Sequence, residues 1–129
     1  MKTLDMIDLL KKSEPNLSTT VMRIGVLPND GLIIPGFPEA LLVFDDENFT
    51  IYTFEGLIKL TYEDQKFDFR FDQIKEIELG KYNFKDRYLK LTFKDDRYIA
   101  FSYHLKDKKY PDQSRFVEVF MHKLESLAN

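Results

Sequence analysis

The fold of this chain is decided by residues 40–103, which read ALLVFDDENFTIYTFEGLIKLTYEDQKFDFRFDQIKEIELGKYNFKDRYLKLTFKDDRYIAFSY. Short apolar and aromatic runs alternate there with turns rich in Asp, Glu, Asn and Gly. Within several runs the apolar residues occupy every second position, as in KFDFRF (66–71), where the three Phe share one face. This period of two predicts β-strands with one face packed on a core.

Working outward from this stretch, the pattern predicts a β meander over residues 19–104, with seven or so strands. The strand segments lie at residues 19–27, 40–44, 49–54, 57–62, 66–71, 74–82, 87–93 and 98–103. Polar clusters between them, such as 63–65 and 94–97, are expected to be turns. The segment 32–38 (LIIPGFP) contains two Pro, which lack N–H donors, so we expect a loop or a short edge segment there.

Two helices flank the meander. In residues 3–12, Leu4, Ile7 and Leu10 lie three positions apart, which predicts a short helix. A helix this short must pack on the domain or on a partner. Residues 112–127 have a longer apolar stripe, made of Phe116, Phe120, Leu124 and Leu127. We therefore expect a mainly β fold with a short N-terminal helix and a C-terminal helix closing the meander.

Composition limits the classes of protein that the chain can belong to. Its 129 residues, 43% of them hydrophobic and 15% aromatic, suffice for a single domain, residues 1–129, with a real core. The net charge of −3 argues against nucleic-acid partners, which require a basic face. The absence of Cys excludes disulfides and thiolate sites and fits a reducing compartment. Acidic residues interrupt the N-terminal apolar run, so we expect no signal peptide and a cytoplasmic location.

No catalytic, metal or cofactor site is predicted. His104 and His122 are the two histidines, and a zinc site would need further ligands. The carboxylate pairs at 45–46 and 95–96 are explained by turn chemistry. The chain has no Gly-x-Ser-x-Gly motif, and GLIIPG (31–36) lacks the Lys-Ser/Thr ending of a phosphate-binding loop. We therefore predict that the protein is not an enzyme.

Several of these segments together resemble the bacterial pleckstrin-homology-like (PH-like or GRAM-like) domains. The resemblance covers residues 19–127 and rests on ALLVF (40–44) with NFTIY (48–52), FDQIKEI (71–77), LKLTF (89–93) with YIAF (98–101), and the closing helix 112–127. It implies a strongly bent antiparallel sheet or partly open barrel of about seven strands, capped by the C-terminal helix. The N-terminal helix is extra to this pattern. Domains of this family generally bind lipids, peptides or proteins.

The resemblance has one departure that bears on the ligand. Phosphoinositide-binding members carry several Lys and Arg between their first two strands, whereas residues 28–38 contain none here. An anionic headgroup needs charge-assisted donors. We therefore predict a binding or assembly module that contacts a protein or an apolar surface, with self-association as one form. Its interaction surface is predicted at Leu32, Ile33, Ile34 and Phe37 and on the N-terminal helix at Leu4, Ile7 and Leu10.

Three alternatives stay open at the sequence level. Residues 32–38 could fold back over the core instead of staying exposed. The barrel could carry a small apolar ligand among Phe67, Phe69, Phe71, Leu89 and Phe101. The basic stretch over 81–97 could touch RNA or an acidic membrane, although interleaved Asp residues favour a solvated face.

Overall fold

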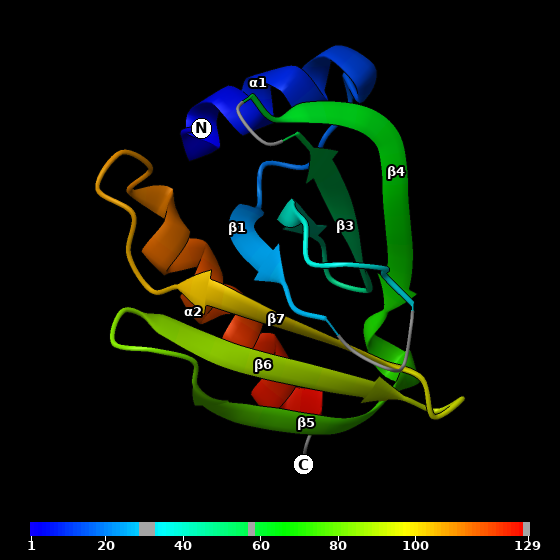
Figure 1. Ribbon diagram of the computed structural model, residues 1–129. Helices are drawn as coiled ribbons and strands as arrows, with labels where there is room; N and C mark the ends of the chain where they lie inside the picture. Colours follow the sequence, from blue (N-terminus) through cyan, green and yellow to red (C-terminus); the bar gives the residue numbers. More distant parts are fainter. Residues whose placement is uncertain (29–32, 57–58, 128–129) are drawn as a thin grey trace.

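The computed structural model describes residues 1–28, 33–56 and 59–127, and shows a sheet of seven antiparallel strands with two α-helices (Figure 1). The helices are α1 (Thr3–Ser13) and α2 (Asp112–Leu127), and a short 3-10 helix, η1 (Phe71–Gln73), follows the fourth strand. The strands are β1 (Val21–Val26), β2 (Glu39–Phe44), β3 (Asn48–Glu55), β4 (Thr61–Arg70), β5 (Ile74–Lys81), β6 (Asp86–Phe93) and β7 (Tyr98–His104). The predicted fold class is confirmed.

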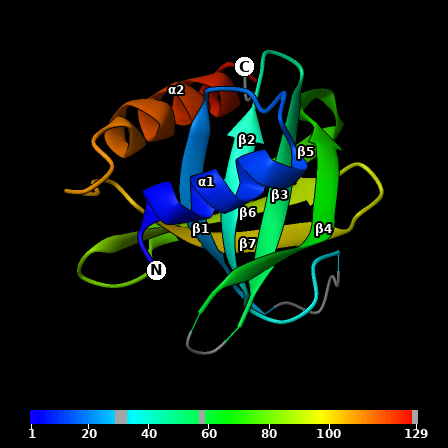
Figure 2. The ribbon, with the colours of Figure 1, turned by 90° about the horizontal axis from the view of Figure 1, so that it is seen from above.

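The strand order is β4-β3-β2-β1-β7-β6-β5. β4 and β5 are therefore the two edges of the sheet, although only η1 separates them in sequence. The sheet bends strongly, so that β5, β6 and β7 cross the direction of β1 to β4 (Figure 2). Among the described strands, β4 pairs with β3 alone and β5 pairs with β6 alone, so the sheet does not close into a barrel.

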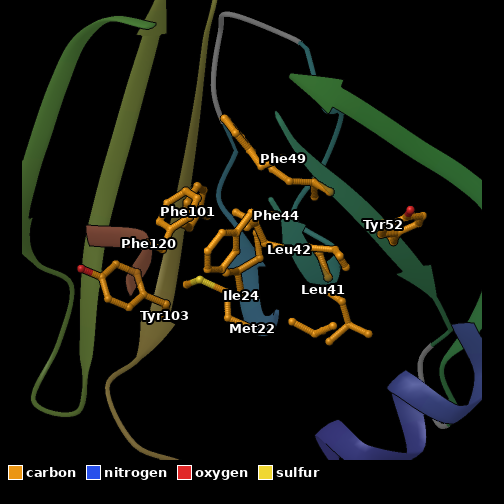
Figure 3. Packing of buried hydrophobic residues seen from close by; sticks show 14 of the residues in the cluster. Met22, Ile24, Leu41, Leu42, Phe44, Phe49, Tyr52, Phe101, Tyr103 and Phe120 are labelled. Atoms are coloured by element: carbon orange, nitrogen blue, oxygen red, sulfur yellow. The ribbon is translucent and has the colours of Figure 1, made fainter. Parts of the chain in front are cut away.

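The core lies inside this bend, under α2. Phe120 of α2 is fully buried, and its ring meets those of Phe44 at 5.3 Å and Phe49 at 5.7 Å. Figure 3 shows Phe44, Phe101 and Phe120 gathered in this core. The predicted stripe on α2 is buried at Phe116, Phe120 and Leu124, but Leu127 in the last turn is 41% exposed, so that part of the prediction is wrong.

β2 is buried on both faces, which explains its unbroken apolar run. Leu42 faces the core under α2, whereas Leu41 lies on the side of α1, near Tyr52 (Figure 3). Both leucines have no exposed surface. The helix α1 buries Thr3, Met6, Ile7 and Leu10, and leaves Leu4 49% exposed. Of the three residues predicted on this helix, Ile7 and Leu10 therefore pack on the domain, whereas Leu4 stays on the surface because the buried face centres on Met6.

The turn predicted at residues 63–65 is absent. β4 is one strand of ten residues that runs through this segment. Asp64 takes a left-handed backbone conformation (φ 62°), and the register between β3 and β4 shifts between Tyr52 and Phe54. A β-bulge of this kind inserts residues without ending the strand, so the polar cluster at 63–65 forms a bulge and not a turn. The predicted strand 57–62 overlaps β4 at its end, and its residues 57–58 lie outside the described residues.

Candidate functional site

A surface groove of about 490 Å³ lies where the sheet fails to close, between β4 and the hairpin that joins β6 to β7. One wall is the run of residues 66–70 in β4. The other side is formed by Phe93, Lys94, Asp95 and Arg97 of the hairpin, with Gln73 at the corner and Ile33 from the segment before β2. The groove therefore joins two parts of the sheet that do not pair with each other.

The floor of the groove is a stack of aromatic rings. Phe69 lies parallel to Phe93, with ring centroids 5.0 Å apart and an interplanar angle of 9°. On its other side, Phe69 stacks on the buried Phe49 at 5.0 Å. Offset-stacked rings at this spacing attract one another beyond their buried area. The stack fixes the position of the edge strand β4 against β6 and gives the groove an apolar base.

Charged side chains surround this floor, and cations are in excess. Lys66, Arg70, Lys94 and Arg97 line the groove together with two carboxylates, Asp68 and Asp95. The lining alone thus has a charge of +2, and Glu14 and Asp72, which lie just outside it, pair with Lys66 and Arg70. Intramolecular ion pairs hold part of this charge in place: Arg97 Nε donates to Asp95 Oδ2 at 2.8 Å, and Lys66 Nζ lies 3.4 Å from Glu14 Oε1.

Arg70 also sets the ionisation of a neighbouring carboxyl group. Its guanidinium donates to Asp72 at 3.2 Å and 2.9 Å and, with Gln73, lowers the pKa of Asp72 to about 2. A carboxyl group whose pKa is lowered in the folded state stabilises the fold at pH values above its ordinary pKa of 3.8. This contribution is lost as the pH falls toward 2. We expect Arg70→Gln to return the pKa of Asp72 toward 3.8, measured by NMR titration of its carboxyl carbon. The more distant Arg97→Gln is the control; equal pKa values in the Arg70 variant and the parent would contradict the assignment.

The backbone of β4 also faces the groove. Successive residues of a strand point to opposite faces of its sheet. A groove lined by the consecutive residues 66–70 must therefore follow the edge of the strand and not one of its faces. Because β4 is an edge strand, alternate N–H and C=O groups along this edge are directed away from β3.

The structure separates the residues predicted as an interaction surface. Ile34 is buried (1% exposed), Ile33 is half-buried and lines the groove, and Phe37 is 75% exposed. Leu32 lies outside the described residues. On α1, Ile7 and Leu10 are buried and Leu4 is exposed. The segment 32–38 was expected either to fold over the core or to stay exposed. Both occur, because Ile34 is buried in the core and Phe37 is exposed.

The residues predicted to line a carrier interior are also divided. Phe71, Leu89 and Phe101 are buried in the packed core, whereas Phe67 and Phe69 are half-buried and line the outer groove. The two histidines belong to different elements and have different carboxylate neighbours. His104 Nδ1 contacts Asp86 on β6, and His122 lies 4.0 Å from Glu125 within α2.

Sequence reasoning missed the groove itself. Its cations come from β4 and from the β6–β7 hairpin, and only Lys94 and Arg97 belong to the basic stretch noted in the sequence. The alternation of Phe and charged residues in 66–71 was a usable signal, since it marks a half-buried strand. It does not reveal that β4 is an edge.

A bent sheet of seven antiparallel strands that is followed by a C-terminal helix defines a PH-like fold, as the sequence resemblance implied. Residues 44–119 match the family described as "TP0260 family, third domain", and the chain belongs to that family. A comparison with curated proteins finds no match.

Solved structures show similarities of fold at low sequence identity. The C-terminal domain of an unknown protein from Leishmania infantum is 12% identical, with a TM-score of 0.57, over 92% of this chain and 97% of that one. The N-terminal PH domain of human ARAP2 is 14% identical, with a TM-score of 0.47, over 84% of this chain and 83% of that one. The PH domain of USP37 is 16% identical, with a TM-score of 0.48, over 83% and 92%. None of the helices in the described part of the chain has the length and hydropathy needed to cross a membrane.

Proposed function

We propose that this protein is a non-enzymatic binding module whose groove takes up an extended segment of a partner protein. The observation that carries the proposal is the lining of the groove by residues 66–70, which places the free edge of β4 beside an aromatic floor. An extended peptide can add to such an edge as a further strand, with main-chain hydrogen bonds for affinity and side-chain pockets for specificity.

The chemistry of the lining indicates which segment fits. An apolar side chain would lie on Phe67, Phe69 and Phe93. A neighbouring carboxylate would meet Lys94, the lining cation that makes no ion pair with another described residue. A compact polyanion fits less well, because Arg70 and Arg97 already pair with the protein's own carboxylates. A phosphate would also need charged donors from the segment before β2. Residues 33–38 carry no charge, and from this segment Ile33 lines the groove. The partner segment is therefore expected to alternate apolar and acidic residues.

Three narrower statements remain predictions beside this proposal: membership of the bacterial PH-like or GRAM-like group, a cytoplasmic location, and self-association through residues 3–12 or 32–38. The exposed Leu4 and Phe37 are the members of the predicted surface that a second copy could reach without unpacking the core. Light scattering on the intact chain and on a Leu4→Ser/Phe37→Ser variant would distinguish a dimer from a monomer.

The groove is tested with a fluorescein-labelled peptide that alternates Glu and Leu. Because Lys94 and Arg97 lie at the groove, the reversal Lys94→Glu/Arg97→Glu is expected to weaken binding about tenfold or more, measured by fluorescence anisotropy. The matched control is Lys81→Glu/Lys85→Glu, an equal change of charge at the far end of β6. Equal losses in the two variants, or equal affinity for a Lys–Leu peptide, would exclude the groove as the site.

The strand-addition mode has its own test, which leaves the protein unchanged. N-methylation of alternate peptide amides removes donors to the edge of β4, so one of the two methylation registers is expected to reduce affinity about tenfold. The other register, which methylates amides directed away from β4, is the control. If neither register weakens binding, the peptide does not bind as a strand.

A further inference from the structure

The hairpin that joins β5 to β6 presents aromatic side chains to solvent at the opposite end of β6 from the groove. Phe84 at its apex is 101% exposed, and Tyr82 is 49% exposed. On the adjoining edge strand, Leu79 is 53% exposed. Figures 1 and 2 show this hairpin reaching beyond the body of the domain. Large apolar side chains that stay exposed near one another indicate a contact surface, and Phe84 and Tyr82 lie two residues apart in this turn.

Hydrogen bonds hold this turn in a defined conformation. Asn83 Oδ1 accepts from the N–H groups of Lys85 at 2.9 Å and Asp86 at 2.8 Å. Asn83 Nδ2 donates to Asp86 Oδ2 at 3.3 Å, and Asp86 also contacts His104 on β7. The position of Phe84 is therefore built by an Asx-type turn that is anchored to the sheet. The backbone that carries Phe84 therefore loses little conformational freedom when it meets a partner.

The same end of the molecule is basic. His104, the last residue of β7, pairs with Asp86 at the base of the hairpin, so the loop 105–109 starts beside it. We call residues 81–85 and 105–109 together the basic tip. Its five Lys and one Asp give a charge of +4, which leaves −7 on the rest of a chain whose net charge is −3. The single Asp107 is engaged with Thr3 Oγ1 at 2.8 Å.

We propose that the basic tip docks on an anionic lipid bilayer, with Phe84 inserted at the interface and the lysines over the headgroups. Aromatic rings concentrate at membrane interfaces, and each Lys near an anionic leaflet adds to the attraction. The negative remainder of the chain would orient this end toward such a surface. Leu105, at the start of the loop 105–109, is 40% exposed and adds an apolar side chain to the basic tip. Stacking of nucleic-acid bases would instead need aromatic rings inside a charged groove, whereas Phe84 stands at the apex of a hairpin.

Because the chain contains no Trp, a single introduced Trp reports the contact directly. The reporter is Phe84→Trp, and its matched control is Phe37→Trp, at a position that is 75% exposed and belongs to the segment before β2. With mixed phosphatidylserine–phosphatidylcholine vesicles we expect the emission of the Phe84→Trp variant to shift to the blue and to be quenched by brominated lipid, and neither change in the Phe37→Trp variant. Vesicles of phosphatidylcholine alone should give neither change. Equal responses in the two variants, or none in Phe84→Trp at low salt, would overturn the proposal.

Charge reversal gives a second test on the unlabelled chain. We expect Lys106→Glu/Lys108→Glu to weaken cosedimentation with the phosphatidylserine vesicles about tenfold or more. The control Lys11→Glu/Lys12→Glu makes the same change at exposed positions of α1 and should bind as the parent does. A parent chain that binds oligouridine and ignores vesicles, or two variants that lose binding equally, would contradict a lipid partner. Both tests are independent of the groove, whose peptide affinity should not change.

Discussion

Replacing Phe120 by Ala is expected to lower the free energy of unfolding by about 3–5 kcal/mol, the range for large-to-small changes of a buried Phe. Phe120 has no exposed surface and joins α2 to the bent sheet through Phe44 and Phe49 and to η1 through Phe71. Its removal would leave a cavity between three rings from different segments, which cannot collapse together. Most domains of this size have a total stability of about 5–15 kcal/mol, so the variant is expected to be marginal.

Urea denaturation followed by circular dichroism measures this effect. The neighbouring Val119→Ala is the control, because Val119 is 47% exposed on the outer face of α2 and should change stability by about 0.5 kcal/mol or less. An Ala variant at position 120 that unfolds at the same urea concentration as the parent would show that α2 does not close the core.

The second large effect is expected at Gln113, a polar residue with no exposed surface. Its Oε1 accepts from the N–H of Arg23 at 2.8 Å, and its Nε2 donates to the C=O groups of Arg23 at 3.0 Å and His104 at 3.2 Å. The pairing of β1 with β7 begins at Ile24, so the Gln113 side chain serves the backbone groups just beyond the ladder. Gln113→Leu would leave these part-buried groups without the partners that Gln113 supplies, and we expect a loss of about 2–4 kcal/mol.

Hydrogen exchange provides a local readout of the same change. The amide of Arg23 should exchange much faster in Gln113→Leu, while amides in the middle of the β2–β3 ladder should exchange according to global stability. The adjacent Ser114→Ala is the control, because the hydroxyl of Ser114 makes an exposed hydrogen bond to Pro111. Unchanged protection of Arg23 would mean that water or a shift of the strand replaces the side chain.

The strands and helices could be predicted because their apolar residues repeat with the period of the structure they form. In β6, Leu89 and Leu91 are fully buried as the alternation predicted, and Phe101 of β7 behaves in the same way. The prediction failed at residues 63–65, where a bulge at Asp64 keeps the strand intact. A cluster of polar residues has the same composition in a bulge and in a turn, so composition alone does not separate them.

Positions on the molecular surface were harder to predict. Leu4 and Ile7 have the same helical spacing, yet one is exposed and the other is buried. Phe37 and Ile34 lie three residues apart in one apolar segment and differ in the same way. Hydrophobicity indicates that a residue gains from burial, but the packing of the assembled domain decides which residues are buried.

Local sequence patterns were enough to predict the class of fold. Strand periodicity, turn residues and the amphipathic pattern of α2 can each be recognised within a few neighbouring positions. Three features depended on the assembled sheet: the open edge of β4, the groove whose floor is the stacked pair Phe69 and Phe93, and the joining of residues 81–85 with 105–109 into the basic tip. Each brings together residues that are distant in sequence. Such contacts arise from strand order and the bend of the sheet, and the period of a segment does not encode its neighbours in the sheet.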